Sequence, residues 1–289
     1  MKVTNAQRAE ILTQALPYIQ KYNGKIIVVK YGGNAMINEE LRHQVMGDIV
    51  LLSLVGIKVV LIHGGGPEIS SLLKKVGKKS EFVNGLRVSD RETIDYVEMA
   101  LAGKVNKDLV SILNTLGGKC MGLSGVDGMM IQAKMRDAEL GFVGDIEKVD
   151  IGPINDLLEK GYIPVVSTLG CDKEGNIYNI NADTAAARIA GELGAESLIT
   201  MTDIAGILRD KDDPESLIPE IDIIEAGQLF AEGVISGGMI PKVECCIEAI
   251  AHGVKKVFIL DGRVPHSILV EMLTDEGAGT MVVEKRAGK

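Results

Sequence analysis

The chain has 289 residues, of which 46% are hydrophobic, enough to build one large α/β domain or two lobes around a full core. The net charge is −9 and no long block of Lys and Arg occurs, which argues against a nucleic-acid partner. The longest apolar runs, such as residues 49–57, are shorter than the about 20 residues of a membrane span, and the N-terminus lacks a signal-peptide pattern. We therefore expect a cytoplasmic protein that contacts no membrane.

The cysteines and histidines do not form a recognisable metal motif. None of the cysteines belongs to a C-x-x-C pair, and the four histidines are scattered without an H-E-x-x-H arrangement. We expect reduced thiols and no metal held by protein side chains. The cysteines are Cys120, Cys171, Cys245 and Cys246.

The first predicted element is a helix at residues 5–22, where apolar residues recur at helical spacing. Thr4 or Asn5 can cap its start, and Pro17 removes an interior hydrogen bond and should kink it. Such a helix either packs on its own body or serves as an appendage.

From residue 24 onward, buried strand patterns alternate with amphipathic helix patterns, apart from a hairpin expected within residues 128–150. Continuous β-branched runs between helices are typical of a mostly parallel sheet that is covered on both faces. We therefore predict an α/β fold, a three-layer αβα sandwich around a central sheet, with the N-terminal helix appended. Strands are expected within residues 25–33, 58–66, 162–170, 195–203, 254–262 and 279–285, and helices within 39–56, 67–77, 90–116, 153–161, 182–194, 238–253 and 266–277.

Two glycine-rich turns follow buried strands, one at Gly32–Gly33 and one at Gly64–Gly66. Ligands of parallel sheets bind at the carboxyl ends of strands, and the second turn leads into a helix beginning near Pro67. Exposed N–H groups and the helix dipole favour an anion there. Neither turn matches a P-loop or a dinucleotide fingerprint, so each alone is equally explained as a tight turn. Their occurrence as a pair favours a shared anion site.

Charged and amide residues accompany these turns. Lys30 ends an apolar strand directly before the first turn, where it is either a cation for a phosphate or a residue extending to solvent. Lys242 follows another glycine pair and is either a second such cation or a solvated first-turn lysine. Asn179, Asn181 and Asp183 alternate along what reads as extended chain, so we expect them to point the same way. Asp183 is alternatively a helix cap.

Seven motifs in this order resemble the amino-acid kinase family over residues 24–284, in particular its arginine-sensitive branch that acts on N-acetyl-L-glutamate. The motifs are VVKYGGNAM, LIHGGGPEIS, NGLRVSD, YNINADTAAARIA, TDIAGIL, SGGMIPKV and GTMV. The resemblance implies the fold of that family. It also implies ATP-dependent phosphorylation of the side-chain carboxylate of N-acetyl-L-glutamate, with Mg²⁺. A carboxylate nucleophile is already ionised at neutral pH and needs no general base.

The resemblance also implies roles for individual residues. Lys30 and Lys242 would stabilise the transferring phosphoryl group and Asp183 would hold both lysines. Gly33 and Gly65 would donate backbone N–H groups to the phosphoryl oxygens. The implied substrate-binding residues are Gly65, Gly66, Arg87, Asn179 and Asn181, and the implied nucleotide-binding residues are Asp203, Gly206, Gly237 and Gly238.

By the same resemblance, residues 1–23 form an oligomerisation and regulatory helix, residues 24–195 an acetylglutamate-binding lobe and residues 196–289 an ATP-binding lobe. Helices of this kind interlock dimers into a homo-hexamer, a trimer of dimers, in the arginine-sensitive branch. Feedback inhibition by L-arginine is then expected between this helix and the C-terminal lobe. The implied contributors are Tyr18, His266, Glu276 and Gly277.

Three alternatives stay open at the level of sequence. A related kinase acting on glutamate, aspartate or aminoadipate shares these turns, although no appended domain is evident and the NGLRVSD segment favours a blocked amino acid. A non-catalytic arginine sensor would keep the fold but would not need Lys30, Lys242 and Asp183. A nicotinamide-dependent dehydrogenase lacks its fingerprint here.

Overall fold

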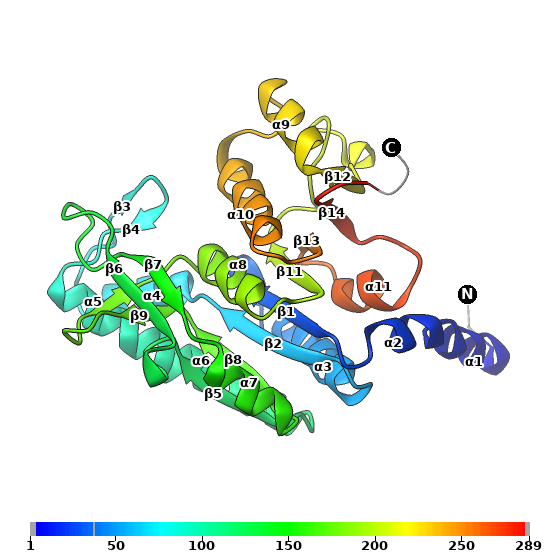
Figure 1. The fold of residues 1–289 in the computed structure, drawn as a ribbon, viewed down its shortest axis with the longest axis horizontal. Helices are drawn as coiled ribbons and strands as arrows, with labels where there is room; N and C mark the ends of the chain where they lie inside the picture. Colours follow the sequence, from blue (N-terminus) through cyan, green and yellow to red (C-terminus); the bar gives the residue numbers. More distant parts are fainter. Residues whose placement is uncertain (1–3, 37, 287–289) are drawn as a thin grey trace.

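The protein is represented by a computed structural model that describes residues 4–36 and 38–286 (Figure 1). In this part of the chain, an eight-stranded sheet has the order β12-β14-β13-β11-β1-β2-β8-β5. Neighbouring strands are parallel except that β14 runs antiparallel to β13, which confirms the predicted mostly parallel sheet. The strands are β1 (Ile26–Tyr31), β2 (Lys58–His63), β5 (Cys120–Ser124), β8 (Ile163–Ser167), β11 (Ser197–Thr202), β12 (Glu220–Asp222), β13 (Lys256–Asp261) and β14 (Gly279–Val283).

Helices cover both faces of this sheet, which confirms the three-layer sandwich. Successive side chains of a strand point to opposite faces, so Ile27 and Val29 pack in one core while Val28 packs in the other. One face is covered by α3 (Glu39–Leu54), α6 (Asn106–Thr115) and α11 (Ser267–Leu273). The opposite face is covered by α7 (Gly152–Glu159), α8 (Ala182–Glu192), α9 (Ile223–Ala231) and α10 (Ile240–Ala251).

Two smaller sheets lie beside the main one. The order β10-β9-β6-β7 joins β6 (Ile131–Met135), β7 (Gly144–Val149), β9 (Leu169–Cys171) and β10 (Ile177–Asn179), and β6 pairs antiparallel with β7 as the sequence predicts for the hairpin. A second hairpin joins β3 (Phe82–Val83) to β4 (Leu86–Arg87). Its turn consists of Asn84 and Gly85, both with positive φ, the arrangement that two-residue hairpin turns require.

The long helix expected at residues 90–116 is interrupted by a π-helical segment. It comprises α5 (Arg91–Glu98), the π-helix η2 (Met99–Val105) and α6. π-Helical segments inside α-helices are frequent at functional sites. The helix α4 (Gly66–Lys75) follows the second glycine turn and packs against α5 and η2. Short 3₁₀ helices occur at Gly33–Met36 (η1), Asp127–Met129 (η3), Pro214–Ser216 (η4) and Gly237–Met239 (η5).

The N-terminal segment is two helices rather than the single kinked helix predicted. α1 (Asn5–Gln14) and α2 (Leu16–Tyr22) meet at Ala15, and Pro17 lies in the first turn of α2, where its missing N–H costs nothing. Thr4 caps α1 through a reciprocal capping box with Gln7. Figure 1 shows α1 extending away from the body, and none of its residues is buried.

α2 lies against α11, and its last residue, Tyr22, belongs to the core. α1 and α2 are therefore attached to the body through α2. None of the helices in the described residues is both long and apolar enough to span a membrane.

Candidate active site

The two glycine turns lie side by side at one edge of the sheet. β1 and β2 are parallel neighbours with Lys30 opposite Ile62 and Tyr31 opposite His63. The Gly64 N–H donates a hydrogen bond to the Tyr31 carbonyl at 3.1 Å, which joins the two turns. The other glycine N–H groups of the two turns therefore lie within one small region, as an anion site requires.

Lys30 forms a largely buried ion pair beside these turns. Its Nζ lies 2.8 Å from a carboxylate oxygen of Asp183, which follows the start of α8. Burial raises the pKa of Asp183, but the charges of Lys30 and Lys242 together outweigh burial and hold this pKa below its ordinary value. Asp183 is therefore ionised at neutral pH. A Cβ at Gly32 would lie only 3.3 Å from Lys30 Nζ, so this glycine leaves room for the ammonium group.

The expected alternation of Asn179, Asn181 and Asp183 on one strand face is wrong. β10 ends at Asn179, and α8 begins at Ala182. Asn181 is the helix N-cap, because its side-chain oxygen accepts the N–H groups of Asp183 at 2.9 Å and Thr184 at 3.1 Å. Asp183 is thereby placed in the first helical turn, where its carboxylate is free to bind Lys30.

Arg87 is buried in the β3–β4 hairpin and held by neutral groups. Its guanidinium donates to the hydroxyls of Ser80 at 2.7 Å and Ser70 at 2.8 Å and to the Gly66 carbonyl at 3.1 Å. It also lies over the Phe82 ring, 4.6 Å from the centroid. Among the described residues Arg87 forms no ion pair, so its charge is oriented but not neutralised. This arrangement is suited to an anionic ligand.

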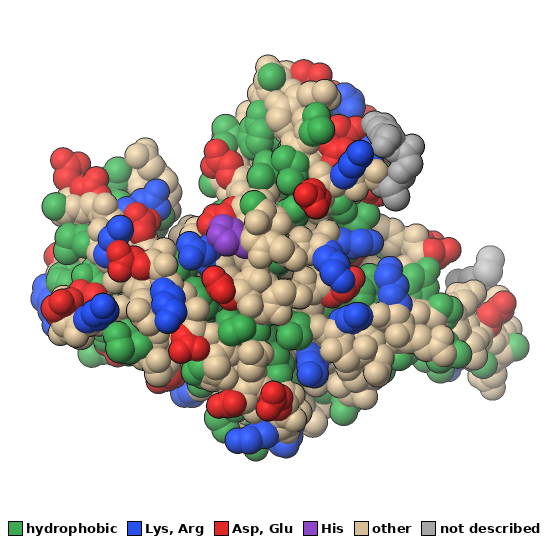
Figure 2. Space-filling model, viewed as in Figure 1, with side chains coloured by type: hydrophobic (Ala, Val, Ile, Leu, Met, Phe, Trp, Pro, Cys, Tyr) green, Lys and Arg blue, Asp and Glu red, His purple; other side chains and the backbone are tan. Residues whose placement is uncertain are grey.

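Two cavities bring most of these residues together. The larger, of about 560 Å³, lies where Figure 2 shows a hollow between the surfaces over β3–β4 and α10, and Asp183, Lys242 and Gly238 line it. The smaller, of about 160 Å³, is lined by Gly64–Gly66, Arg87 and Asn179 among others. Asn181 lines both, so the two cavities meet there. A reaction between two ligands fits such adjoining cavities.

The expected nucleotide-binding residues belong to two loops. Asp203 and Gly206 follow β11 and line neither of these cavities, whereas Gly237 and Gly238 form η5 just before α10. Gly206 has φ +144°, and a Cβ there would lie 2.7 Å from both the Thr280 hydroxyl and Leu217. Glycine is thus required at position 206 for conformation and for space.

The expected arginine-binding residues lie near α2 and α11. Tyr18 in α2 packs on the core that contains α11, and His266 precedes α11 with φ +59°. His266 Nδ1 lies 2.6 Å from the buried carboxylate of Asp48 in α3. Glu276 and Gly277 are exposed in the loop after α11. His266 and the Glu276–Gly277 pair thus flank the two ends of α11, and α2, which carries Tyr18, contacts this helix.

Comparison with known proteins decides the family. Residues 25–261 match the Amino acid kinase family. The chain belongs to this family. It is 58% identical over 281 residues to the acetylglutamate kinase of Brachyspira hyodysenteriae, covering 96% of this chain and 98% of that relative.

Solved structures show the same amino acid kinase fold. N-acetylglutamate synthase from Neisseria gonorrhoeae, complexed with coenzyme A and N-acetyl-glutamate, is 26% identical with a TM-score of 0.84. The match covers 96% of this chain but 64% of the synthase, so the chain spans less than two thirds of that protein. Carbamate kinase from Giardia lamblia bound to AMP-PNP has a TM-score of 0.69 at 18% identity, covering 91% of this chain and 99% of that one, and shows the fold alone.

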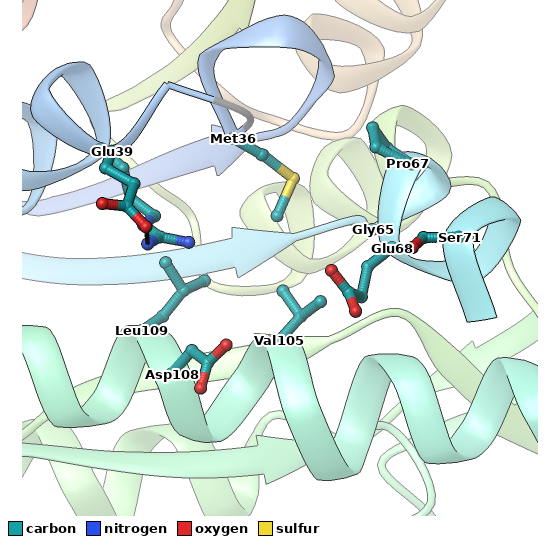
Figure 3. A pocket seen from close by; sticks show the side chains of 10 residues that line it. Met36, Glu39, Gly65, Pro67, Glu68, Ser71, Val105, Asp108 and Leu109 are labelled. Atoms are coloured by element: carbon teal, nitrogen blue, oxygen red, sulfur yellow. Dashed lines mark ion pairs between the residues drawn. The ribbon is translucent and has the colours of Figure 1, made fainter. Parts of the chain in front are cut away.

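A third cavity of this amino acid kinase was not anticipated from the sequence. It has about 340 Å³ and lies behind the second glycine turn, lined by Gly65, Val105 and Leu109 among others (Figure 3). In it Glu39 forms a long ion pair with Arg42, 3.9 Å apart. Sequence reasoning also missed Ser70 and Ser80, the partners of Arg87, because their roles depend on a hairpin folding over α4.

Proposed function

We propose that this amino acid kinase transfers the γ-phosphoryl group of ATP to the side-chain carboxylate of N-acetyl-L-glutamate, giving N-acetyl-L-glutamyl 5-phosphate in arginine biosynthesis. The supporting observation is the buried Lys30–Asp183 pair, 2.8 Å apart, beside two adjoining glycine turns. The 58% identity to an acetylglutamate kinase over nearly the whole of both chains supports this acceptor.

In this proposal the acceptor occupies the smaller cavity. Arg87 binds the α-carboxylate with two donors, since its charge is not neutralised by the protein, and Asn179 and Asn181 complete the pocket. Gly66 adjoins the substrate there. The lobe that binds the acceptor comprises residues 24–195.

The chemical problem is repulsion between an anionic nucleophile and the phosphates of ATP. Lys30 and Lys242, both oriented by the ionised Asp183, offset this repulsion, and N–H groups of Gly33 and Gly65 bind the phosphoryl oxygens. Asp183 organises the lysines and is not a proton acceptor, because the acceptor carboxylate is ionised already. Catalysis then consists of positioning and charge stabilisation.

ATP is assigned to the lobe of residues 196–289, with Asp203, Gly206, Gly237 and Gly238 bordering it. The described residues include no group of three or more His, Cys, Asp or Glu side chains able to hold a metal ion. In the proposal Mg²⁺ is carried by the nucleotide phosphates, as is common for this ion. Bound Mg²⁺ would neutralise phosphate charge.

Regulation by L-arginine and assembly into a hexamer, a trimer of dimers, complete the proposal. Tyr18, His266, Glu276 and Gly277 would contribute to the arginine site. The exposed α1 supports the assembly, because it carries apolar side chains such as Leu12, 75% exposed, that nothing in the described chain covers.

A direct assay tests the activity. ADP release is measured with N-acetyl-L-glutamate, L-glutamate, L-aspartate and L-2-aminoadipate, and the acyl phosphate is trapped with hydroxylamine as a hydroxamate. We expect ADP release and trapping with N-acetyl-L-glutamate, and at least about 100-fold less with the others, because their charged α-ammonium group replaces the neutral acetamide and would enter a cavity that Arg87 lines. Equal rates with free glutamate would contradict this acceptor.

A further inference from the structure

His63 and Asn106 form a fully buried polar pair directly behind the second glycine turn. His63 ends β2, Asn106 begins α6, and neither is exposed to solvent. His63 Nδ1 lies 2.8 Å from the carbonyl oxygen of Gly64, and His63 Nε2 lies 3.1 Å from the side-chain nitrogen of Asn106. Neither residue lines the two cavities of the candidate active site. The pair therefore needs an explanation other than ligand contact.

The partners of His63 determine which ring nitrogen carries the proton. A carbonyl oxygen can only accept, so Nδ1 donates to Gly64, and Nε2 accepts from Asn106. Burial lowers the pKa of His63 to about 4, opposed by the hydrogen bond to Gly64 and assisted by the charge of Lys107. The ring is therefore neutral near pH 7 and keeps one tautomer.

Asn106 is itself held in one orientation. Its side-chain nitrogen also lies 2.9 Å from the Val165 carbonyl and 3.2 Å from the Leu123 carbonyl, and both oxygens can only accept. The amide oxygen accepts from Lys107 at 3.0 Å. A Cβ at Gly122 would collide with this amide, so the glycine in β5 leaves the space that Asn106 occupies. Strands β5 and β8 thus fix Asn106, and Asn106 fixes the imidazole ring.

The ring in turn fixes one peptide of the glycine turn. The Gly64 carbonyl and the Gly65 N–H belong to the same planar group, and no peptide in the described chain is cis. In a trans peptide these two groups point in opposite directions. Because His63 binds the Gly64 carbonyl, the Gly65 N–H is directed away from the ring.

A second contact holds the turn from the side of the π-helix. A Cβ at Gly65 would lie 2.6 Å from Leu101 Cδ2 and 3.3 Å from Val105 Cγ2, so η2 packs directly on the Gly65 backbone. Figure 3 shows Val105 below the turn that carries Gly65. The Gly65 Cα thus has little room to move, and the remaining freedom is rotation of its preceding peptide.

We propose that His63, oriented by Asn106, is a positioning residue for phosphoryl transfer that aims the Gly65 N–H at the phosphoryl oxygens. The inference rests on the proposed kinase function and adds a residue to it. His63 acts through Gly64 and does not touch a substrate. Loss of the Nδ1 donor lets the peptide rotate, so the N–H no longer meets the charge that develops during transfer.

Two amide substitutions separate this role from simple stability. In His63→Asn the side-chain nitrogen takes the place of the Nδ1 donor, and in His63→Gln the side-chain oxygen takes the place of the Nε2 acceptor while the Nδ1 donor is lost. Cys120→Val is the matched control. It removes another buried donor, the Cys120 thiol of β5, which donates to the Val110 carbonyl of α6 and lies away from the glycine turn. For each full-length protein, kcat, both KM values, the kcat–pH profile from pH 6 to 9 and the thermal midpoint are measured.

We expect His63→Gln to lower kcat about 10- to 100-fold with both KM values within about twofold, as for a small displacement of a catalytic donor. His63→Asn keeps kcat within about threefold of wild type, Cys120→Val matches wild type, and all pH profiles have the same shape. Equal kcat values for the His63→Asn and His63→Gln variants would overturn the positioning role of His63. So would the loss, in both variants, of one limb of the kcat–pH profile seen in the wild type.

If the wild-type protein releases no ADP with N-acetyl-L-glutamate, the proposed function itself is overturned. The comparison of His63 variants cannot overturn that function. Wild-type activity together with an active His63→Gln variant would overturn only the positioning role.

Discussion

At the scale of single residues, the candidate active site depends on charges that the fold has oriented but not neutralised. Lys30 pairs with the Asp183 carboxylate at 2.8 Å, and the charge of Lys242 also helps to hold the pKa of Asp183 below its ordinary value. Arg87 has only neutral partners. Net positive charge is therefore left for anionic ligands, which the proposed reaction supplies.

The first prediction concerns Lys30 and Lys242. Lys30→Ala or Lys242→Ala should lower kcat at least about 100-fold and raise the KM for acetylglutamate far less, because the lysines act mainly on charge that develops in the transition state. Steady-state ADP release checks this. Lys255→Ala, which removes an exposed partner of Glu196, is the matched control and should keep wild-type kcat. Near-normal turnover in both lysine variants would refute the assignment.

Arg87 leads to a different expectation. Arg87→Ala should raise the KM for acetylglutamate about 10- to 100-fold with a smaller change in kcat, because charge-assisted hydrogen bonds to a non-reacting carboxylate contribute roughly 1.5–3 kcal/mol. Arg87→Lys should recover only part of the affinity, since an ammonium group cannot bind two oxygens in a fixed plane. A normal KM in Arg87→Ala would place the α-carboxylate elsewhere.

At the scale of elements, the sequence predicted regular structure well and local exceptions poorly. The alternation of strands and helices, the hairpin of β6 and β7 and the adjoining glycine turns follow from hydrophobic periodicity and the rules for parallel sheets. The π-helix η2 was not predictable from the sequence. A π-helical turn is wider than an α-helical turn, but over seven residues this difference does not alter the spacing of apolar residues enough to be recognised.

Three of the local features that the sequence analysis did not predict are nevertheless indicated by nearby residues. Asn84–Gly85 is a strong hairpin signal and marks the turn of the β3–β4 hairpin, whose second strand contains Arg87. Asn181 two residues before Asp183 is a better N-cap than an extended residue, and it explains why the expected strand alternation fails. Pro17 signals a helix start as well as a kink. The buried pairing of His63 with Asn106, 43 positions apart, had no local signal.

The N-cap of α5 gives a prediction for stability and pH. Asp90 accepts the Thr93 N–H at 2.7 Å and pairs with Lys78, also at 2.7 Å. The hydrogen bond from Lys78, followed by those from Thr93, lowers the pKa of Asp90 to about 2. Because this folded-state pKa lies below the ordinary value of about 3.9, the charged cap stabilises the fold above pH 4, and the contribution is lost as the pH falls toward 2.

Asp90→Ala should therefore lower the free energy of unfolding by about 1 kcal/mol at pH 7, the usual cost of losing a cap. Asp90→Asn keeps a capping oxygen and should cost less. Chemical denaturation at pH 7 and at acidic pH measures both effects, and the difference between wild type and Asp90→Asn should shrink as the pH falls below 4. A constant difference would show that the charge of Asp90 contributes nothing.

At the scale of the whole molecule, one sheet runs through both proposed lobes while α1 stands apart. β1 and β11 are parallel neighbours, so strands from the two halves of the chain share one hydrogen-bonded layer. α1 has no buried residue, whereas α2 ends in the buried Tyr22 and lies against α11. A change in α1 should thus leave the sheet and the candidate active site intact.

Removing residues 1–14 tests the proposed assembly and regulation. The cut retains α2, because deleting Tyr22 would also damage the core. We expect wild-type kcat, loss of inhibition by L-arginine and a change from hexamer to dimer, measured by ADP release and by light scattering coupled to size exclusion. Leu12→Glu, which changes a single exposed apolar side chain of α1, should weaken the hexamer in the same direction. If a dimeric variant is still fully inhibited by L-arginine, inhibition does not depend on the hexamer, and the proposed link between the two is wrong.

Gly32 has a consequence for anyone who redesigns this enzyme. Its neighbour Gly33 has φ +70° and begins η1, whereas Gly32 has an ordinary φ. Position 32 needs glycine for space, because a Cβ there would lie 3.3 Å from the Nζ of Lys30. Saturation mutagenesis of this turn should accordingly yield inactive clones at position 32 that still express, crystallise and resist heating. Screens based on yield or thermotolerance alone would retain them.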